Sequence, residues 1–553
     1  MASIGLSNRV NDNNVKWYTL IAACFALFMA MLDNLVVNIA LPTISRDLDA
    51  RATQLQWVIS AYTLVFASLQ ITAGGLGDKF GRKRWFMIGL VIFTVVSAIA
   101  AFSNSMNMLI TMRALQGLGA ALIMPLSLSL ISNAFPPEER GRAIGIWSAV
   151  SVSSIALGPV IGGAIVEYFH WGWIFLINVP IGIIALLVTQ AVVRESRDES
   201  GTVATDVPGT ILITAGIAAL TWGLIQAGER GWTDTWILAA FLAAAIILPV
   251  FVWVEMRAER PMIPMSFFRS RTFVGANIDS FMIAFLITGV SFFMTLYQQN
   301  IHGFSPIRTG LALVPMVAVM MVFSPLSGSM VNKLGPRRRI SFGMIVTGIG
   351  TGLFLMSGVG VSYWRILPAF LLMGFGMSFI WAPMTTAVLN SVSSEKSGIA
   401  SAVNGSLREI GTAFGVALLG TLANRAYKAE FNGNSDIQAL RASGGEAAAP
   451  VIDLVGAGMN NAGRVLGQLI DSGDYPQLAS IPAQVVQTLE HASAEAFMVG
   501  MDRAIIFSTA GIIIAAVISY FLIEDAVVER ALEPDGDREP RPGDVEFVPG
   551  AAD

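Results

Sequence analysis

Three charged residues, Asp33, Arg113 and Asp279, lie inside long apolar stretches of sequence. If those stretches cross a bilayer, an unpaired charge costs about 3 kcal/mol or more, so pairing or contact with a wet cavity is expected. A buried carboxyl can take up a proton when its positive partner moves away, because burial favours the neutral form and a nearby arginine favours the charged form. Such residues are suited to exchanging a proton for a cationic solute.

Asp33 and Arg113 are expected at similar depths. Asp33 lies eight residues before the end of its apolar stretch at Leu41, about 12 Å at the rise of a helix. Arg113 lies five residues after the start of another stretch at Met108, about 8 Å deep. The two can therefore pair, and a fixed structural ion pair stays open as an alternative to proton coupling or substrate binding.

The composition explains why so few charges stand out. Of 553 residues, 54% are hydrophobic and only 13% charged, whereas soluble domains contain roughly 25% charged residues. A soluble, disordered or collagen-like chain is excluded, and an integral membrane protein remains. One cysteine and three histidines argue against a disulfide or a metal cluster, and a net charge of -4 argues against nucleic-acid binding.

Long apolar runs predict an all-α integral membrane fold with fourteen transmembrane helices. The runs are continuously apolar rather than alternating, which excludes a membrane β-barrel. They lie near 17–40, 54–76, 85–102, 108–132, 141–166, 171–191, 207–227, 235–254, 272–297, 309–331, 339–357, 364–389, 398–424 and 502–523.

A sequence repeat, which we call the internal echo, divides these helices into two sets. Residues 74–83 (GGLGDKFGRK) and 328–337 (GSMVNKLGPR) follow the second and tenth runs with Gly, Lys, Gly and Arg in the same order. Two parallel six-helix halves plus two inserted helices are typical of transporters. The expected parts are an N-terminus at 1–16, a first half at 17–191, a linker at 192–206, inserted helices at 207–254, a second half at 272–523 with an outside loop at 425–500, and an acidic disordered tail at 524–553.

Lysine and arginine set the expected orientation. With the N-terminus inside, the inside loops and their flanks carry seventeen Lys and Arg residues and the short outside loops carry five. This bias predicts a multi-pass protein of a bacterial-type plasma membrane with both termini cytoplasmic.

The first copy of the repeated loop is similar to the G-x-L-x-D-R-x-G-R-K signature of the major facilitator superfamily, and the chain resembles its fourteen-span drug:proton antiporter branch. The resemblance implies gating roles around this loop, with a simple topology anchor as the alternative. The gating residues so implied are Gly74, Asp78, Gly81, Arg82, Lys83 and Arg142. Arg408 belongs instead to a stretch from Asn404 to Gly415 that resembles the N-x-x-x-R-x-x-G pattern of that branch, where a local gate contact and a chemical role both stay open.

Three further motifs carry the resemblance. Residues 32–42 resemble the D-x-T-I-V-N-x-A-L-P motif of that branch, with Asn38 one place late, and Arg113, Gln116, Gly117 and Gly119 resemble R-x-x-Q-G-x-G, which is linked to proton coupling. The antiporter motif G-x-x-x-G-P-x-x-G-G is matched by Ser154, Gly158, Pro159, Gly162 and Gly163. The resemblance implies proton coupling or substrate binding at Asp33, Asn38, Arg113 and Gln116.

Asp279 belongs to none of these motifs. We expect it either to form a second acidic site for a cationic substrate or a proton, or to be an interfacial acid paired with Arg269 or Arg271. Aromatic side chains could stack on flat cations, with ordinary packing as the alternative. These are Trp57, Tyr62, Trp147, Phe293, Tyr297 and Trp381.

The sequence therefore predicts a proton-driven exporter of small amphipathic or cationic compounds, a multidrug efflux protein without enzymatic activity. It needs no cofactor beyond a proton gradient, and its partners are a small-molecule substrate, protons and membrane lipids. The loop at 425–500 could receive an accessory partner. Export of a lipid, siderophore or secreted metabolite on the same fold is the alternative, and no P-loop for ATP is present in the sequence.

Overall fold

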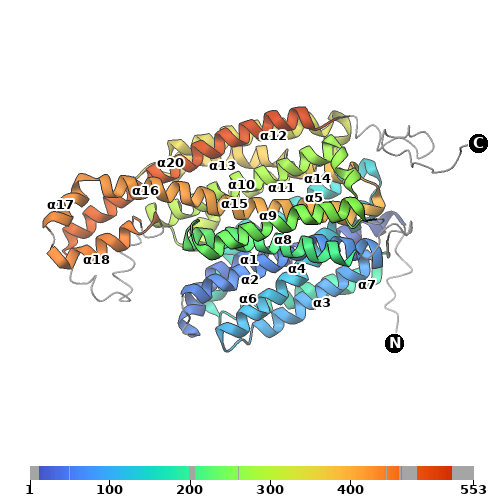
Figure 1. Ribbon diagram of the computed structural model, residues 1–553, viewed down its shortest axis with the longest axis horizontal. Coiled ribbons are helices and arrows are strands. Elements are labelled where there is room, and N and C mark those ends of the chain that lie inside the picture. Colours follow the sequence, from blue (N-terminus) through green and yellow to red (C-terminus); the bar gives the residue numbers. More distant parts are fainter. Residues whose placement is uncertain are drawn as a thin grey trace, which may run out of the picture.

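The computed structural model describes residues 12–525 except 49, 51, 198–205, 259–260, 444, 460–461 and 464–481. Regular structure in this part of the chain is entirely helical (Figure 1). The predicted acidic tail beyond 525, most of the N-terminal segment 1–16 and part of the linker 192–206 lie outside the described residues.

Seven helices make up the first part of the bundle, and the predicted sixth run is divided between the last two. They are α1 (Asp12–Asp47), α2 (Ala52–Phe80), α3 (Arg82–Ala100), α4 (Met106–Ala134), α5 (Pro137–Tyr168), α6 (Trp173–Leu176) and α7 (Asn178–Val192). Two helices follow before the repeat of this pattern, α8 (Val207–Arg230) and α9 (Thr235–Arg257).

The second part has more interruptions. Its elements are η1 (Met265–Arg269), α10 (Arg271–Leu296), the π-helix η2 (Tyr297–Ile301), α11 (Pro306–Leu334), α12 (Pro336–Gly352), η3 (Leu353–Met356), α13 (Tyr363–Ser378), α14 (Trp381–Asn390), η4 (Ser394–Lys396), α15 (Ser397–Phe414), the π-helix η5 (Gly415–Leu419), α16 (Gly420–Gly433), α17 (Ser435–Ser443), α18 (Gly445–Gly456) and α20 (Ala483–Leu522).

The bundle has two ends, which we name from the chain. The proximal end is where α1 begins and α20 finishes, and the distal end is where α16, α17 and α18 project away from the rest of the bundle (Figure 1). The two loops of the internal echo, between α2 and α3 and between α11 and α12, both lie at the proximal end.

Twelve helices within the described residues are long and apolar enough to cross a membrane. The chain is thus a multi-pass membrane protein. Helix α5 and the continuous run from α15 to α16 occupy the positions of the fifth and thirteenth predicted spans and are not among these twelve. The total of fourteen therefore stays a prediction.

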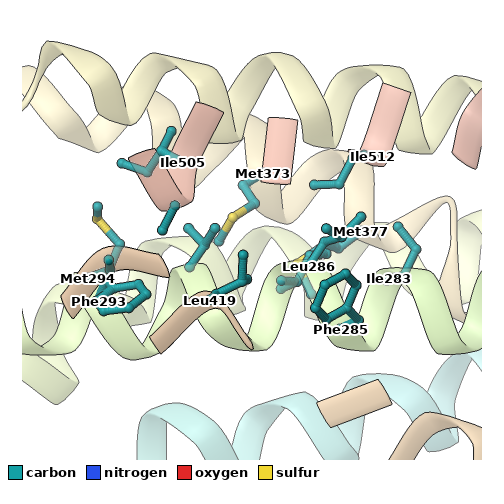
Figure 2. Packing of buried hydrophobic residues seen from close by; sticks show 14 of the residues in the cluster. Ile283, Phe285, Leu286, Phe293, Met294, Met373, Met377, Leu419, Ile505 and Ile512 are labelled. Carbon is teal, nitrogen blue, oxygen red and sulfur yellow. The ribbon is translucent and has the colours of Figure 1, made fainter. Parts of the chain in front are cut away.

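Buried apolar side chains form separate clusters in the two parts of the chain. One cluster and a smaller neighbour join side chains mainly from α1 to α7. A larger cluster joins side chains mainly from α8 to α20. Figure 2 shows part of it, where Phe285 and Leu286 of α10 lie near Met377 of α13 and Ile512 of α20.

The two parts meet along two lines of close helix contact. Helix α5 packs along α11, where a Cβ at Gly145 would lie 2.6 Å from the Ser324 carbonyl oxygen. Helix α2 packs on α15, where a Cβ at Gly74 would lie 2.6 Å from the Gly398 carbonyl oxygen. Glycine at these positions lets the backbones approach closely, as small residues do between membrane helices.

The inserted helices α8 and α9 cover the second of these lines. Helix α8 packs on α2 and also touches α15, and the hydroxyls of Thr72 and Thr214 lie 3.0 Å apart across the α2–α8 contact. Helix α9 packs against α8 and is mostly exposed along its apolar surface. The insertion therefore lies between the α2–α15 contact and the surrounding lipid.

The predicted outside loop at 425–500 is far more helical than expected. Helix α16 continues to Gly433, two short helices follow, and α20 begins at Ala483 rather than near 502. The stacked rings of Tyr427 and Phe431 and the buried side chains of Val455 and Phe497 give this segment an apolar core of its own. The described part of this segment is therefore helical where a loop was expected from the sequence.

Gly328 on α11 tests whether close backbone approach limits stability. A Cβ there would overlap the carbonyl oxygen of Gly141 on α5, whereas nothing lies within 4 Å of a Cβ added at Gly420. We expect Gly328→Ala to cost about 1–3 kcal/mol, as overpacking does, and Gly420→Ala to cost nothing. Thermal unfolding of the purified protein in detergent measures the difference, and equal melting temperatures for both variants would contradict the close packing.

Candidate functional site

Asp33 on α1 and Arg113 on α4 form a buried ion pair, as their depths predicted. The Arg113 Nη1 donates to Asp33 Oδ2, and the two residues are 0% and 1% exposed. Isolated charges are not stable in such surroundings, so each side chain depends on the other for its place.

Amides complete the coordination of the carboxylate. The Asn178 Nδ2 on α7 donates to Asp33 Oδ1 at 2.7 Å, and the Gln116 Nε2 donates to the same oxygen at 3.3 Å. Gln116 also accepts from Arg113 Nη1 at 3.0 Å and donates to the Ser97 hydroxyl at 2.6 Å. Side chains of α4 and α7 thus bind the carboxylate of α1, and Ser97 of α3 holds the two amides.

Arg113 has further partners that hold its position. Its Nε donates to the Val58 carbonyl oxygen at 3.2 Å, and its guanidinium lies 4.4 Å from the centre of the Tyr62 ring. Tyr62 is buried, so the packing interpretation applies to it rather than stacking on a free solute. The arrangement can store or release a charge inside the first half of the bundle.

Two residues of this cluster were not chosen from the sequence, and one that was chosen lies outside it. Asn178 and Ser97 were missed, although an asparagine in the apolar run 171–191 was the available signal. Asn38 does not join the ion pair, because its side chain is exposed and donates to the Asn34 carbonyl oxygen at 3.1 Å.

Asp78 links the two parts of the bundle at the proximal end. Its carboxylate accepts from the backbone N–H groups of Gly398 at 3.1 Å and Ile399 at 2.8 Å, in the first turn of α15. It also accepts from Arg82 Nε at 2.7 Å. A carboxylate at a helix N-terminus satisfies unpaired N–H groups and interacts favourably with the helix dipole.

Arg82 strengthens the same junction. Its Nη2 donates to the Glu395 carbonyl oxygen, just before α15, and both Arg82 and Asp78 are buried. Gly81 has φ 110°, a conformation that favours glycine, and this turn places Arg82 at the start of α3. The gating residues Gly74, Asp78, Gly81 and Arg82 are therefore brought together.

Other polar contacts close the proximal end. The Arg140 Nη1 on α5 donates to Asn390 Oδ1 at 3.1 Å, and the Ser129 hydroxyl on α4 lies 2.7 Å from that of Ser397. With the Asp78 junction, these contacts join the two parts of the bundle around α4, α5, α14 and α15. The structure represents a conformation closed at the proximal end.

The remaining gating residues lie apart from the Asp78 junction. Lys83 Nζ donates to the Gln190 carbonyl oxygen at 3.0 Å, and Arg142 lies over the Trp17 ring at 5.7 Å. Arg408 lies 3.7 Å from Glu409, 3.1 Å from the Met124 sulfur and 5.8 Å from the Trp381 ring centre. Arg408 is thus a second contact between α15 and α4.

A pair of capping acids repeats in the two parts of the chain. Glu195, three residues after α7, accepts from the backbone N–H groups of Lys83 and Arg84 at 3.0 and 3.1 Å, at the start of α3. Asp525, three residues after α20, accepts from the Arg337 N–H at 3.1 Å, at the start of α12. These acids extend the internal echo, and their equal spacing from the helix ends was the signal in the sequence.

Asp279 is buried in the bundle and is not the interfacial acid that one of its two alternatives predicted. It is 0% exposed, and neither carboxylate oxygen has a hydrogen-bond partner. It lies on the side of α10 that packs on α20, near the Ser519 hydroxyl, while Asn277 and Ser280 of the same helix bond to Asn404 on α15. No pairing with Arg269 or Arg271 is seen.

The glycines of the antiporter motif provide close helix contacts. A Cβ at Gly158 would lie 2.8 Å from Leu35 Cβ, and one at Gly162 would lie 3.0 Å from Val36 Cγ1, both on α1. A Cβ at Gly163 would lie 2.7 Å from Ile307 Cγ1 on α11. Pro159 lies within α5. The motif therefore sets the position of α1, which carries Asp33.

A bundle of long apolar helices in two similar parts, with buried ion pairs in the first part and hydrogen bonds between the parts, is typical of membrane transport proteins. Residues 23–416 match the Major Facilitator Superfamily. The chain belongs to this family of transporters and is not an enzyme.

Known relatives agree with this assignment. The chain is 34% identical over 524 residues to the tetracenomycin C resistance and export protein of Streptomyces glaucescens, covering 94% of this chain and 93% of that protein. It is 35% identical over 411 residues to the multidrug resistance protein Stp of Mycobacterium tuberculosis, covering 74% and 76%. The fold resembles the proton:xylose symporter XylE, with TM-score 0.55, 14% identity and coverage of 74% and 89%.

The Asp78 junction makes a prediction about access from the proximal end. In a Cys24→Ala background, Ser129→Cys places one thiol in the closed region. Adding Asp78→Asn removes a charge-assisted contact of about 1.5–3 kcal/mol, so we expect labelling by a maleimide to become roughly tenfold faster or more. Glu138→Gln, another acidic change at the proximal end, serves as the control. Equal labelling rates with and without Asp78→Asn would contradict the junction.

Proposed function

We propose that this transporter is a proton-coupled exporter of small amphipathic or cationic compounds that works by alternating access. The proximal end faces the cytoplasm in this proposal, which places the two basic loops inside as the lysine and arginine distribution favours. The conformation described is then closed toward the cytoplasm.

The Asp33–Arg113 pair is the observation that carries the proposal. The carboxylate accepts hydrogen bonds from one guanidinium and two amides, all without contact with solvent. Proton arrival at Asp33 would cancel the attraction to Arg113, whose guanidinium has alternative acceptors at Gln116 and Val58. Protonation can therefore move α4 relative to α1 without leaving the arginine unpaired.

The Asp78 junction is the gate whose opening accompanies proton binding at Asp33. Opening toward the cytoplasm requires the carboxylate to leave the first turn of α15 and Arg82 to leave the Glu395 carbonyl oxygen, and closing restores three hydrogen bonds at once. Because Arg113 and Ser129 lie on the same helix, a shift of α4 reaches the proximal contacts directly. Proton binding and gate opening are thus linked through α4.

Asp279 is assigned a second proton in this scheme. An ionised carboxylate in an apolar site without partners is unfavourable by several kcal/mol, so the neutral acid is the stable form in this conformation. Asp279 lies two turns from the proximal start of α10, where opening would admit cytoplasmic water. The proton would be released there.

The substrate class rests on the relatives and on the absence of an exposed cationic residue from the Asp33 cluster. Relatives are named as resistance and export proteins for tetracenomycin C and for multiple drugs. Export of a lipid, siderophore or secreted metabolite is the competing outcome. It predicts that drug cations fail to release protons from the purified protein.

The ion pair can be separated from proton coupling by neutralising both partners. Asp33→Asn alone leaves a buried arginine charge and should cost about 3–5 kcal/mol, whereas Asp33→Asn with Arg113→Gln should be near neutral for stability. We expect the double variant to fold but to lose ethidium uptake into everted vesicles that contain an acidic lumen. Thermal unfolding and the uptake rate are the two measurements.

Controls keep this experiment decisive. Collapsing the pH gradient with nigericin should abolish uptake by the unmodified protein, and uptake that survives would rule out antiport. A double variant with normal, gradient-dependent uptake would reduce the pair to a structural role. Asp234→Asn, which alters a helix cap far from the pair, should leave uptake unchanged.

Asp279→Asn distinguishes a proton site from a cation site. The change imitates a neutral carboxyl, so the melting temperature should stay within about 2 °C of the unmodified protein. Ethidium, a monocation, and propidium, its dicationic analogue, should lose gradient-driven uptake equally if Asp279 binds a proton. A larger loss for propidium would assign the residue to cation binding instead.

A further inference from the structure

Arg408 and Glu409 on α15 form a charge pair inside the bundle that belongs neither to the Asp33 cluster nor to the Asp78 junction. Their side chains are 19% and 16% exposed, whereas those of the Asp33–Arg113 pair are fully buried. Helix α15 is packed against α2, α4, α8, α10 and α14. Charged side chains on such a helix that still meet water are typical of the path of a transported solute.

The two side chains reach toward the first half of the bundle. Arg408 Nη2 donates to the Met124 sulfur on α4 at 3.1 Å. The charge of Glu409 acts on the Tyr62 hydroxyl of α2, and the Arg113 guanidinium lies 4.4 Å from the centre of the Tyr62 ring. The pair therefore lies where the two halves face each other, within electrostatic reach of the Asp33 cluster.

The pair lies on the distal side of the contacts that close the proximal end. Arg408 is ten residues after Gly398 on α15, about 15 Å along the helix. Met124 is five residues before Ser129 on α4, about 8 Å along that helix. Because Gly398 and Ser129 take part in the proximal contacts, water reaches the pair from the distal side in this conformation.

The surroundings of the Arg408 guanidinium resemble a receptor for a flat cation. The guanidinium carbon lies 5.8 Å from the centre of the Trp381 ring on α14. The Arg408 Nε lies 3.7 Å from Glu409 Oε1, which is longer than a hydrogen bond, so the carboxylate holds this guanidinium loosely. An aromatic face, a carboxylate and a polarisable thioether are groups that bind organic cations. Arg408 thus occupies, as part of the chain, a site suited to such a cation.

The same contacts favour a cation over an anion as the external ligand. A solute cation replaces a guanidinium on a long, flexible side chain, and the carboxylate and the indole stay in place during this exchange. Trp381 is partly exposed, so its ring is available to a solute once the guanidinium leaves. An anion instead has to displace Glu409, and it then meets the negative face of the indole ring.

We propose that Glu409 and the Trp381 ring bind the transported organic cation, and that Arg408 occupies this site when the cation has left. The proposal rests on the proposed export function for the origin of its ligand, whereas binding depends on these three side chains. Arg408 competes with the solute for one carboxylate, so the chain itself refills the site after release. A bound cation also adds positive charge near Tyr62 and Arg113, which favours loss of a proton from Asp33.

Ethidium binding to the purified full chain in nanodiscs of phosphatidylethanolamine and phosphatidylcholine tests the site, with fluorescence anisotropy as the readout and no pH gradient. Glu409→Gln should weaken binding roughly tenfold, because it removes the charge partner of the cation. Arg408→Gln should strengthen binding roughly fivefold or more, because the internal competitor is gone. Arg425→Gln and Glu430→Gln, at exposed positions of α16, should leave the dissociation constant unchanged.

Two further variants keep the test decisive if Arg408→Gln does not fold. Arg408→Lys keeps the charge but replaces the planar guanidinium by a more strongly hydrated ammonium, so ethidium should bind roughly threefold more tightly. The Arg408→Gln, Glu409→Gln double variant removes both charges and should bind ethidium as weakly as Glu409→Gln alone. A folded Arg408→Lys protein with unchanged or weaker ethidium binding overturns the competition.

The outcomes separate this site from the export function. Normal ethidium binding by Glu409→Gln overturns the site even if proton-driven uptake by the unmodified protein is found. Weaker binding by both Glu409→Gln and Arg408→Gln would reduce the pair to a structural role. Unchanged ethidium binding with tighter binding of the anion fluorescein by Glu409→Gln would overturn the site in favour of an anion site at Arg408. The expected shifts in binding without any proton-driven uptake would support the site and refute the export function.

Discussion

A carboxylate inside an apolar helix bundle must find positive partners or give up its charge, and this constraint organises the protein. Asp33 is stabilised by a guanidinium and two amides within the first half. Asp78 is stabilised by an arginine and by the first turn of a helix in the second half. Asp279 has neither. The three carboxyl groups therefore have three different roles, because each responds to a different movement of its surroundings.

Helix α4 connects the Asp33–Arg113 pair with the contacts at the proximal end. It carries Arg113 and Gln116 of the ion pair, and fifteen or so residues later it carries the side chains of Ser129 and Asn133 that contact α15. Pro125 lies between these two groups within the helix. Proline removes one backbone hydrogen bond, so it gives a helix a place to bend between its ends. A charge change at one end of α4 and a gate contact at the other are thus linked by a helix that contains its own point of flexibility.

Much of the architecture followed from the sequence because membrane burial imposes simple rules on it. Continuous apolar runs predicted the long helices, and similar depths predicted the Asp33–Arg113 pair. The surroundings of Asp33 on other helices were harder to predict, since nothing local in the sequence shows that Asn178 donates to this carboxylate or that Ser97 accepts from Asn178 and Gln116. The interfacial alternative for Asp279 was wrong for the same reason, because the spacing of Asp279 gives its depth but not which neighbour its side of α10 faces. The helical extension at 425–500 was underestimated because its polar surface hides a small apolar core.

The length of α20 has a mechanical consequence. Its 40 residues form one uninterrupted helix that contacts the distal segment at one end and leads to Asp525, the cap of α12, at the other. An α-helix of that length is about 60 Å long and behaves as a stiff rod, because stretching it would break its backbone hydrogen bonds. A tilt of the distal segment is therefore transmitted along α20 as an opposite tilt of its proximal end, beside Asp279. One rigid helix thus joins the distal segment to the start of α12.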